Sequence, residues 1–171
     1  EASRLTMPFP NLPNKHGETP VLRAADALAS RRGKLHDFTA RSAILCYQSA
    51  PLRWGVRRYR GRRLDGLFGE HYLLRVTESS TLLSGNFGVG APVVGALLEE
   101  FAALGVQRCI GIGLAAALQP SVPPGSLVIA DRAIRDEGTS HHYLPTAKYA
   151  EASPALTARL ASELDAQSLP Y

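Results

Sequence analysis

An amphipathic helical pattern between two apolar segments constrains the fold of this chain more than any other feature. Between residues 92 and 104, apolar side chains recur at helical spacing while Glu99 and Glu100 face away, which predicts a helix with one face packed on a sheet. Apolar segments at residues 81–84 and 106–112 flank this helix as predicted strands. A strand, helix and strand of this length form a β-α-β unit, whose strands run parallel with a right-handed crossover. We therefore expect an α/β protein with a largely parallel sheet.

Further elements are predicted on both sides of this unit. They are helices between residues 19 and 33, 51 and 61, and 154 and 165, and strands at residues 42–47, 72–76 and 126–131. Prolines and a lack of periodicity predict an extended N-terminal arm at residues 1–20. Residues 21–171 are expected to form one α/β domain. Because the chain ends just after a helix, we expect that fold to continue beyond Tyr171.

Length and cysteine content narrow the class of protein. A chain of 171 residues can bury a sizeable core without disulfides or metal ions. Cys46 and Cys109 lie far apart in apolar segments, which favours core positions over a disulfide or metal site and predicts a cytoplasmic setting. No apolar run approaches the roughly 18 to 20 residues that span a bilayer, and no leader-like segment opens the chain. We expect no membrane association and no metal.

Two glycine-rich turns follow predicted strands. The first, GNFGVG at residues 85–90, directly precedes the helix at residues 92–104, and the second lies within CIGIGLAAALQ at residues 109–119. Glycine backbone lets N–H groups approach an anion or a sugar-like ligand closely. Leu114, Ala115 and Ala116, however, offer no hydroxyl, amide or charge. The second turn is therefore a working ligand loop, a disabled one or a core turn.

Six arginines and two aromatic residues share the segment RWGVRRYRGRR at residues 53–63. A solvated helix and turn is the first interpretation, because charge runs usually lie on solvated faces. A pocket for a small anion comes second, since guanidinium groups bind phosphate bidentately. A nucleic-acid surface comes last because no recognition motif accompanies the segment, so we do not expect nucleic acid as a partner.

A longer pattern ties these features to a known family. The run GNFGVGAPVVGALLEEFAALGVQRCIGIGLAAALQPSVPPGSLVIADRAIRDEGTSHHYLP has a glycine-rich turn before a helix, a strand with a second glycine turn, an Ala-Leu-Gln step, a proline-glycine turn and an arginine-acidic-glycine strand end. It resembles the nucleoside phosphorylase superfamily, most closely its uridine-phosphorylase-like branch. The resemblance covers about residues 42–165. It implies a three-layer α/β/α domain with a mixed sheet, assembled as a homo-oligomer, either a dimer or a hexameric ring of dimers.

The resemblance also implies a chemistry. Family phosphorylases cleave the nucleoside N-glycosidic bond with inorganic phosphate as co-substrate, which gives free base and ribose 1-phosphate, and the related nucleosidases use water. As the bond breaks, the ribose becomes cationic and the base anionic, so the site must hold a nucleophile beneath the sugar and donors near the base. We therefore expect a phosphorylase acting on nucleoside and phosphate, with no other cofactor. A nucleosidase, and a non-catalytic homologue that binds nucleoside or acts as an assembly partner, remain alternatives.

The family's phosphate site falls on Arg53, Gly88, Gly113 and Leu114. Arg53 is retained, although residues 49–53 read SAPLR where the family has glycine-aspartate-proline-x-arginine. A second family arginine aligns with Gly111, and the threonine that bridges phosphate and ribose aligns with Leu114. Loss of that hydroxyl and the added bulk of leucine oppose ordinary phosphate binding.

By the same resemblance, the nucleoside site includes Leu114, Ala115, Ala116 and His142. Ala116 replaces a glycine that approaches the base. His142 lies in a polar loop beyond a strand, where ligand contacts of α/β folds collect, and a surface histidine is the alternative interpretation. His16 matches a family histidine that reaches a neighbouring subunit's ribose. The family's methionine-glutamate ribose motif would follow Tyr171, so we do not expect this segment alone to be catalytically complete.

Arg135 and Glu137 match the family's arginine-acidic strand end. A substrate role and a structural ion pair that orders the loop are both open interpretations.

Overall fold

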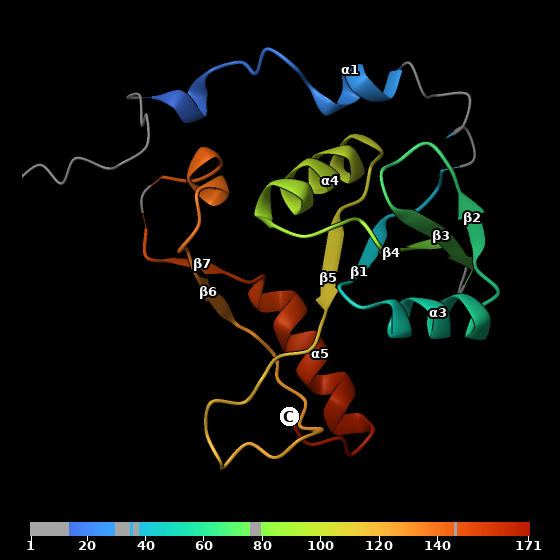
Figure 1. The fold of residues 1–171 in the computed structure, drawn as a ribbon, viewed down its shortest axis with the longest axis vertical. Helices are drawn as coiled ribbons and strands as arrows, with labels where there is room; N and C mark the ends of the chain where they lie inside the picture. The colour runs from blue at the N-terminus through green and yellow to red at the C-terminus, as the bar shows by residue number, and fades with distance from the viewer. Residues whose placement is uncertain (1–13, 30–34, 36–37, 76–79, 146) are drawn as a thin grey trace, which may run out of the picture. The chain divides into compact units, whose positions relative to one another are not determined.

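The computed structural model describes residues 14–29, 35, 38–75, 80–145 and 147–171. The chain divides into two compact units, residues 19–114 and residues 1–18 together with 115–171 (Figure 1). None of the helices in the described residues is both long and apolar enough to cross a membrane. Each unit is built on its own sheet, of five and two strands.

The unit of residues 19–114 contains a five-stranded mixed sheet. Its elements are α1 (Ala24–Ala29), β1 (Ser42–Cys46), α3 (Ser49–Arg58), β2 (Arg62–Leu64), β3 (Glu70–Arg75), β4 (Ser80–Gly85), α4 (Ala91–Ala103) and β5 (Arg108–Ile112). The strand order is β2-β3-β4-β1-β5. Strand β1 pairs in parallel with β4 and β5, whereas β3 pairs antiparallel with β2 and β4. The predicted parallel β-α-β unit is confirmed, with β1 between its two strands.

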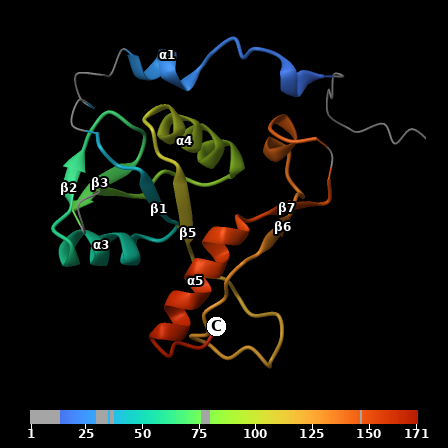
Figure 2. The same ribbon diagram turned by 180° about the vertical axis from the view of Figure 1, so that it is seen from behind.

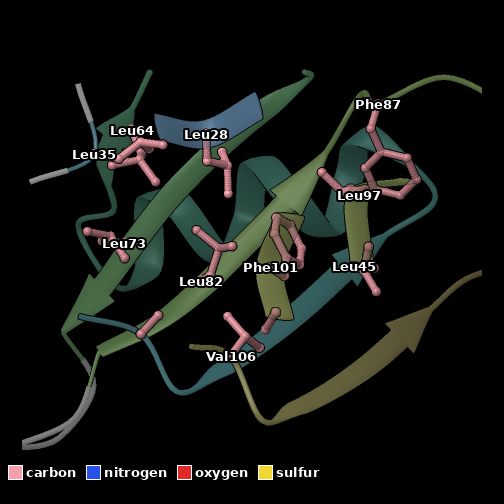
Figure 3. Close-up of a cluster of buried hydrophobic side chains, with 12 residues drawn as sticks. Leu28, Leu35, Leu45, Leu64, Leu73, Leu82, Phe87, Leu97, Phe101 and Val106 are labelled. Atoms are coloured by element: carbon pink, nitrogen blue, oxygen red, sulfur yellow. The ribbon is translucent and has the colours of Figure 1, made fainter. Parts of the chain in front are cut away.

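Helices cover both faces of this sheet. Strand β1 alternates its side chains, so Ala43 and Leu45 join one buried cluster while Ile44 and Cys46 join another. The first cluster packs under α1 and α4 and includes Leu82 and Phe101, which lie over the sheet in Figure 3. The second packs under α3. Figures 1 and 2 show α3 and α4 on opposite sides of the strands, which confirms the predicted three-layer α/β/α arrangement.

Helix α4 forms as its sequence pattern predicts. Leu97 and Phe101 are buried against the sheet, and Phe101 has no exposed surface. Gly90 precedes the helix with a φ of 109°, and Gly105 follows it with a φ of 96°, conformations that favour glycine. Pro92 in the first turn costs no hydrogen bond, because that N–H has no partner within the helix. The helix therefore has glycine at both boundaries.

The second unit is less regular. It contains η1 (Lys15–Gly17), β6 (Arg132–Ile134), η2 (Thr139–His142), β7 (Tyr149–Glu151) and α5 (Pro154–Ala166). Helix α5 matches its prediction, and the Ser153 side chain caps it by accepting from the Leu156 N–H at 3.4 Å. Residues 1–13 of the predicted arm lie outside the described residues.

Several predictions about individual elements were wrong or incomplete. Residues 126–131 do not form the predicted strand; β6 begins at Arg132 and pairs only with β7 among the described strands. Leu127 and Val128 are exposed, and without a partner strand their backbone groups cannot form a ladder. The short strands β2 and β7 had no sequence signal. Both cysteines are free, as predicted, in β1 and β5.

A buried histidine lies between α4 and the sheet. His71 has no exposed surface, its Nε2 donates to the Phe68 carbonyl at 2.8 Å, and its ring meets that of Phe101 edge-on at 5.8 Å. Its Nδ1 and the hydroxyl of Ser84, its cross-strand neighbour, are buried and have no hydrogen-bond partner among the described residues. Burial lowers the pKa of His71 from its ordinary value of 6.5. The fold therefore selects the neutral imidazole.

This burial predicts an acid-sensitive fold. As the pH falls through 6.5, the unfolded chain binds a proton at His71 more readily than the folded chain does, so the free energy of unfolding falls. Urea denaturation from about pH 7.5 to about pH 5 should show this decline, and His71→Phe should flatten it. The exposed His142→Phe variant serves as the control and should retain the wild-type slope. Equal slopes in His71→Phe and the wild type would contradict this assignment.

Candidate functional site

Three strand ends meet at one edge of the five-stranded sheet. In the parallel register Cys46 lies beside Gly85 on one side and Ile112 on the other. The chain therefore leaves β1, β4 and β5 at the same edge, toward α3, the first glycine turn and the second glycine turn. Ligands of α/β folds bind at this carboxyl edge, where loops and helix N-termini supply N–H groups.

A network of side chains orders the first glycine turn. Asn86 has a φ of 52°, in the left-handed region, and its amide donates to Glu70 at 2.8 Å. The Tyr72 hydroxyl donates to the other oxygen of Glu70 at 3.0 Å. These hydrogen bonds, with smaller contributions from Arg63 and Arg53, lower the pKa of Glu70. An ionised carboxylate is thus fixed beside residues 85–90.

In the same turn, Gly88 has a φ of 90°, and a Cβ there would meet only ordinary van der Waals contacts, from Phe68 and Val93. The conformation of Gly88, rather than lack of space, therefore favours glycine.

An aromatic side chain covers the second glycine turn. A Cβ at Gly111 would lie 3.0 Å from Cε2 of Tyr47, and one at Gly113 would lie 3.3 Å from its Cδ2. The ring of Tyr47 also meets Phe87 edge-on at 5.8 Å, which connects the two turns. Glycine at these positions leaves room for Tyr47. The resemblance aligns the second phosphate-binding arginine of the family with Gly111. An arginine side chain at this position would require the Tyr47 ring to move.

The predicted phosphate residues within this unit lie on separate elements. Arg53 is exposed in the second turn of α3, the helix that directly follows β1. Its charge acts on Glu70, whose carboxylate is bonded to Asn86 in the first turn. Leu114 ends the unit and is 85% exposed, so it is not a core residue. Arg53 and the two glycine turns therefore all belong to the strand-end region.

The other predicted residues belong to the second unit. Ala115 and Ala116 are exposed in an irregular segment, and His142 is exposed at the end of η2. His16 donates from Nε2 to the carbonyl oxygen of His141 at 3.2 Å. It therefore contacts its own chain at residues 137–145, the loop that carries His141 and His142 and is called the histidine loop below. Contact of His16 with a neighbouring subunit, and contact of His142 with nucleoside, stay predictions.

Arg135 and Glu137 order the histidine loop through its backbone. The Arg135 guanidinium is buried and donates to the carbonyls of Ser140 and Leu144, each at 3.0 Å, and of Pro145 at 2.6 Å. Glu137 accepts from the N–H groups of Thr139 at 2.6 Å and Ser140 at 3.1 Å. The hydrogen bonds from Ser140 and Thr139 lower the pKa of Glu137. Arg135 also donates to the Ser140 hydroxyl at 3.0 Å. These contacts favour a structural role for both residues, in which each orders the loop through loop groups.

Sequence reasoning missed three residues at the strand ends: Tyr47, Glu70 and Asn86. Asn86 carried a signal, because an asparagine inside a glycine-rich turn is suited to a left-handed backbone conformation. Glu70 and Tyr47 carried none, since only the strand register brings them to the turns. Among the residues that the structure describes, no group of three or more His, Cys, Asp and Glu side chains could hold a metal ion.

Comparison with known proteins assigns the class. Residues 62–171 match a family model described as the Phosphorylase superfamily, and the chain belongs to that superfamily. Its relatives include uridine phosphorylases: the Haemophilus influenzae protein is 35% identical over 85 residues, which are 49% of this chain and 34% of that protein. The Thermococcus kodakarensis uridine phosphorylase is 34% identical over 84 residues, which are 49% of this chain and 30% of that one.

A solved structure agrees with this assignment. The crystal structure of uridine phosphorylase from Vibrio fischeri, complexed with 6-hydroxy-1-naphthoic acid, superposes with a TM-score of 0.70 at 26% identity. The superposed region covers 79% of this chain and 56% of the solved chain. The present chain thus spans about a third of the length of these curated relatives and just over half of the solved one. The uridine-phosphorylase-like resemblance and the fold expected from it are both confirmed.

The buried arginine gives a prediction for the histidine loop. Arg135→Met should lower the free energy of unfolding by about 1–3 kcal/mol, because several loop carbonyls lose a charged donor. Hydrogen exchange at the Tyr143 and Leu144 N–H groups, both bonded to the Ser140 carbonyl, should accelerate. Arg135→Lys, which keeps the charge without the planar fork, should show a smaller change. Unchanged exchange in Arg135→Met would rule out this role.

Proposed function

We propose that this protein cleaves the N-glycosidic bond of a nucleoside with inorganic phosphate and releases the free base and ribose 1-phosphate. Membership of the Phosphorylase superfamily carries the proposal. The meeting of two glycine turns at one sheet edge, with Arg53 on the helix that leaves the same edge, supports it. The proposed assembly is a homo-oligomer, either a dimer or a hexamer.

The geometry suits the charges that this reaction develops. Phosphate would be held by backbone N–H groups at Gly88 and Gly113 and by the guanidinium of Arg53, which together offset its negative charge. An anion fixed beneath the sugar stabilises the cationic ribose as the bond breaks. The fixed carboxylate of Glu70 can stabilise the same positive charge from the side of the first turn.

Three residues favour water as the nucleophile in a second candidate function. Gly111 and Leu114 supply neither the guanidinium nor the hydroxyl that family phosphorylases use, and Glu70 repels a phosphate dianion. Hydrolysis needs no anion site and would tolerate all three. The two functions differ in their products, which are ribose 1-phosphate and free ribose.

The decisive experiment follows free base released from purified nucleosides by the full-length protein, with and without phosphate. Phosphorolysis requires phosphate for release and yields ribose 1-phosphate. Release at the same rate without phosphate would replace this proposal with hydrolysis. Absence of release under both conditions, with nucleoside bound in calorimetry, would favour the non-catalytic homologue.

Substitution of Arg53 should weaken the binding of phosphate without weakening the binding of nucleoside. Arg53→Gln removes a charged donor, so KM for phosphate should rise by about tenfold to a hundredfold while KM for nucleoside changes little. Arg57→Gln, the same substitution one turn further along α3, is the matched control. Equal KM values for phosphate in Arg53→Gln and the wild type would remove Arg53 from the site.

Replacing Leu114 and Ala116 by the residues expected in family phosphorylases should increase the affinity for ligand. Leu114→Thr together with Ala116→Gly returns a hydroxyl and a close backbone approach, so phosphate or nucleoside should bind more tightly in calorimetry. Leu114→Val with Ala116→Gly is the control, because valine has the shape of threonine without its hydroxyl. No gain over this control would show that the second turn is structural.

A further inference from the structure

We propose that the outer face of α3 and the adjoining strand β2 bind single-stranded nucleic acid. This surface, the arginine face, consists of Arg53, Trp54, Arg57, Arg58, Arg60 and Arg63, and Arg63 lies on the α3 side of the sheet because it pairs with Tyr72 of the second cluster. It goes beyond the proposed nucleoside chemistry, which uses only Arg53 of this set. From the sequence, a nucleic-acid surface was the last of three interpretations of residues 53–63. The arrangement of the side chains in the structure now favours it.

The helix presents its arginines and its tryptophan together. Five residues at helical spacing (Ala50, Arg53, Trp54, Arg57 and Arg58) line a shallow hollow of about 470 Å³. Trp54 is 61% exposed, although it is a large apolar side chain with the second cluster of buried residues close beneath its helix. An open aromatic ring among guanidinium groups is the arrangement on which an unpaired base stacks while its phosphates are neutralised.

Neighbouring contacts fix the orientation of these groups. Tyr59 packs partly buried against the second core cluster and meets the Trp54 ring edge-on at 5.9 Å. The Arg58 guanidinium lies over the Tyr59 ring, 5.3 Å from its centre. A ring and a guanidinium that are already positioned lose less conformational entropy when a ligand binds.

The charge of this surface extends beyond the hollow. Residues 53–63 contain six arginines and no acidic residue, and all six arginine side chains are exposed. Arg60, with a φ of 50°, lies in the tight turn that joins α3 to β2, which forms one edge of the sheet and carries Arg63 on its α3 side. Arg63 contacts Asp65 at 3.2 Å, but both side chains are largely exposed and such a pair contributes little. Several exposed guanidinium groups on one surface match consecutive phosphates better than a single small anion.

Single strands fit this face better than duplexes. Stacking on Trp54 requires a base with a free face, which a duplex offers only at its ends. Contacts of guanidinium groups with phosphates and stacking on Trp54 read no base edge. We therefore expect weak dependence on base sequence and strong dependence on salt.

Trp54 is the only tryptophan of the chain, so its fluorescence reports on this face alone. Titration with a uridine oligonucleotide of about eight nucleotides should quench it, with an affinity that falls steeply between about 50 and 200 mM salt. A duplex of the same length and the base-free polyanion heparin should give much less quenching. Quenching by heparin equal to that by the oligonucleotide would overturn the proposal and leave a general polyanion surface.

Matched variants separate stacking from charge. Trp54→Leu should weaken oligonucleotide binding by about tenfold in a gel or anisotropy assay, because it removes one stacked base. Arg57→Gln/Arg58→Gln should reduce the slope of log affinity against log salt by about 1.4, since two phosphate contacts are lost. Arg108→Gln/Arg159→Gln removes the same charge from two other exposed arginines and should leave the slope unchanged.

Two further results would overturn the proposal. One is full-strength binding by both Trp54→Leu and Arg57→Gln/Arg58→Gln. The other is binding of a polyglutamate peptide with the same affinity and salt slope as the oligonucleotide, which would identify the arginine face as a surface for an acidic protein.

Discussion

Strand β1 is the element on which the rest of the larger unit depends. It is paired in parallel on both edges and covered by helices on both faces, so its side chains from Ala43 to Cys46 alternate between two clusters. A parallel strand in this position cannot shift by one residue without exchanging the two clusters. Its fixed register with β4 and β5 is what brings three chain exits to one edge of the sheet.

The same edge combines a retained backbone with altered side chains. The glycines of both turns are present, yet positions that hold phosphate in family phosphorylases carry Gly111 and Leu114 here. Tyr47 packs against Gly111 and Gly113, and Glu70 adds a fixed negative charge. The candidate site therefore combines the backbone N–H groups of two glycine turns and the exposed Arg53 with the fixed negative charge of Glu70.

Much of the fold could be predicted because its signals are local. Helices α4 and α5 have a hydrophobic period with a glycine or proline at a boundary, and the strands of the β-α-β unit are short apolar segments next to glycines. The strand predicted at residues 126–131 was wrong because apolar composition alone does not make a strand. A strand also needs a neighbouring strand to accept and donate its backbone hydrogen bonds. Strands β2 and β7, three residues each, are too short to carry a period and form through pairing with a neighbour.

The sequence by itself determined the superfamily and the α/β/α layers, because motifs, periodicity and composition are properties of consecutive residues. Only the tertiary structure decided which distant residues meet. Tyr47 lies against the second glycine turn and Glu70 is bonded to Asn86 of the first, and neither contact has a sequence signal. The physical reason is that strand register and helix packing, set by burial of the whole core, choose these neighbours.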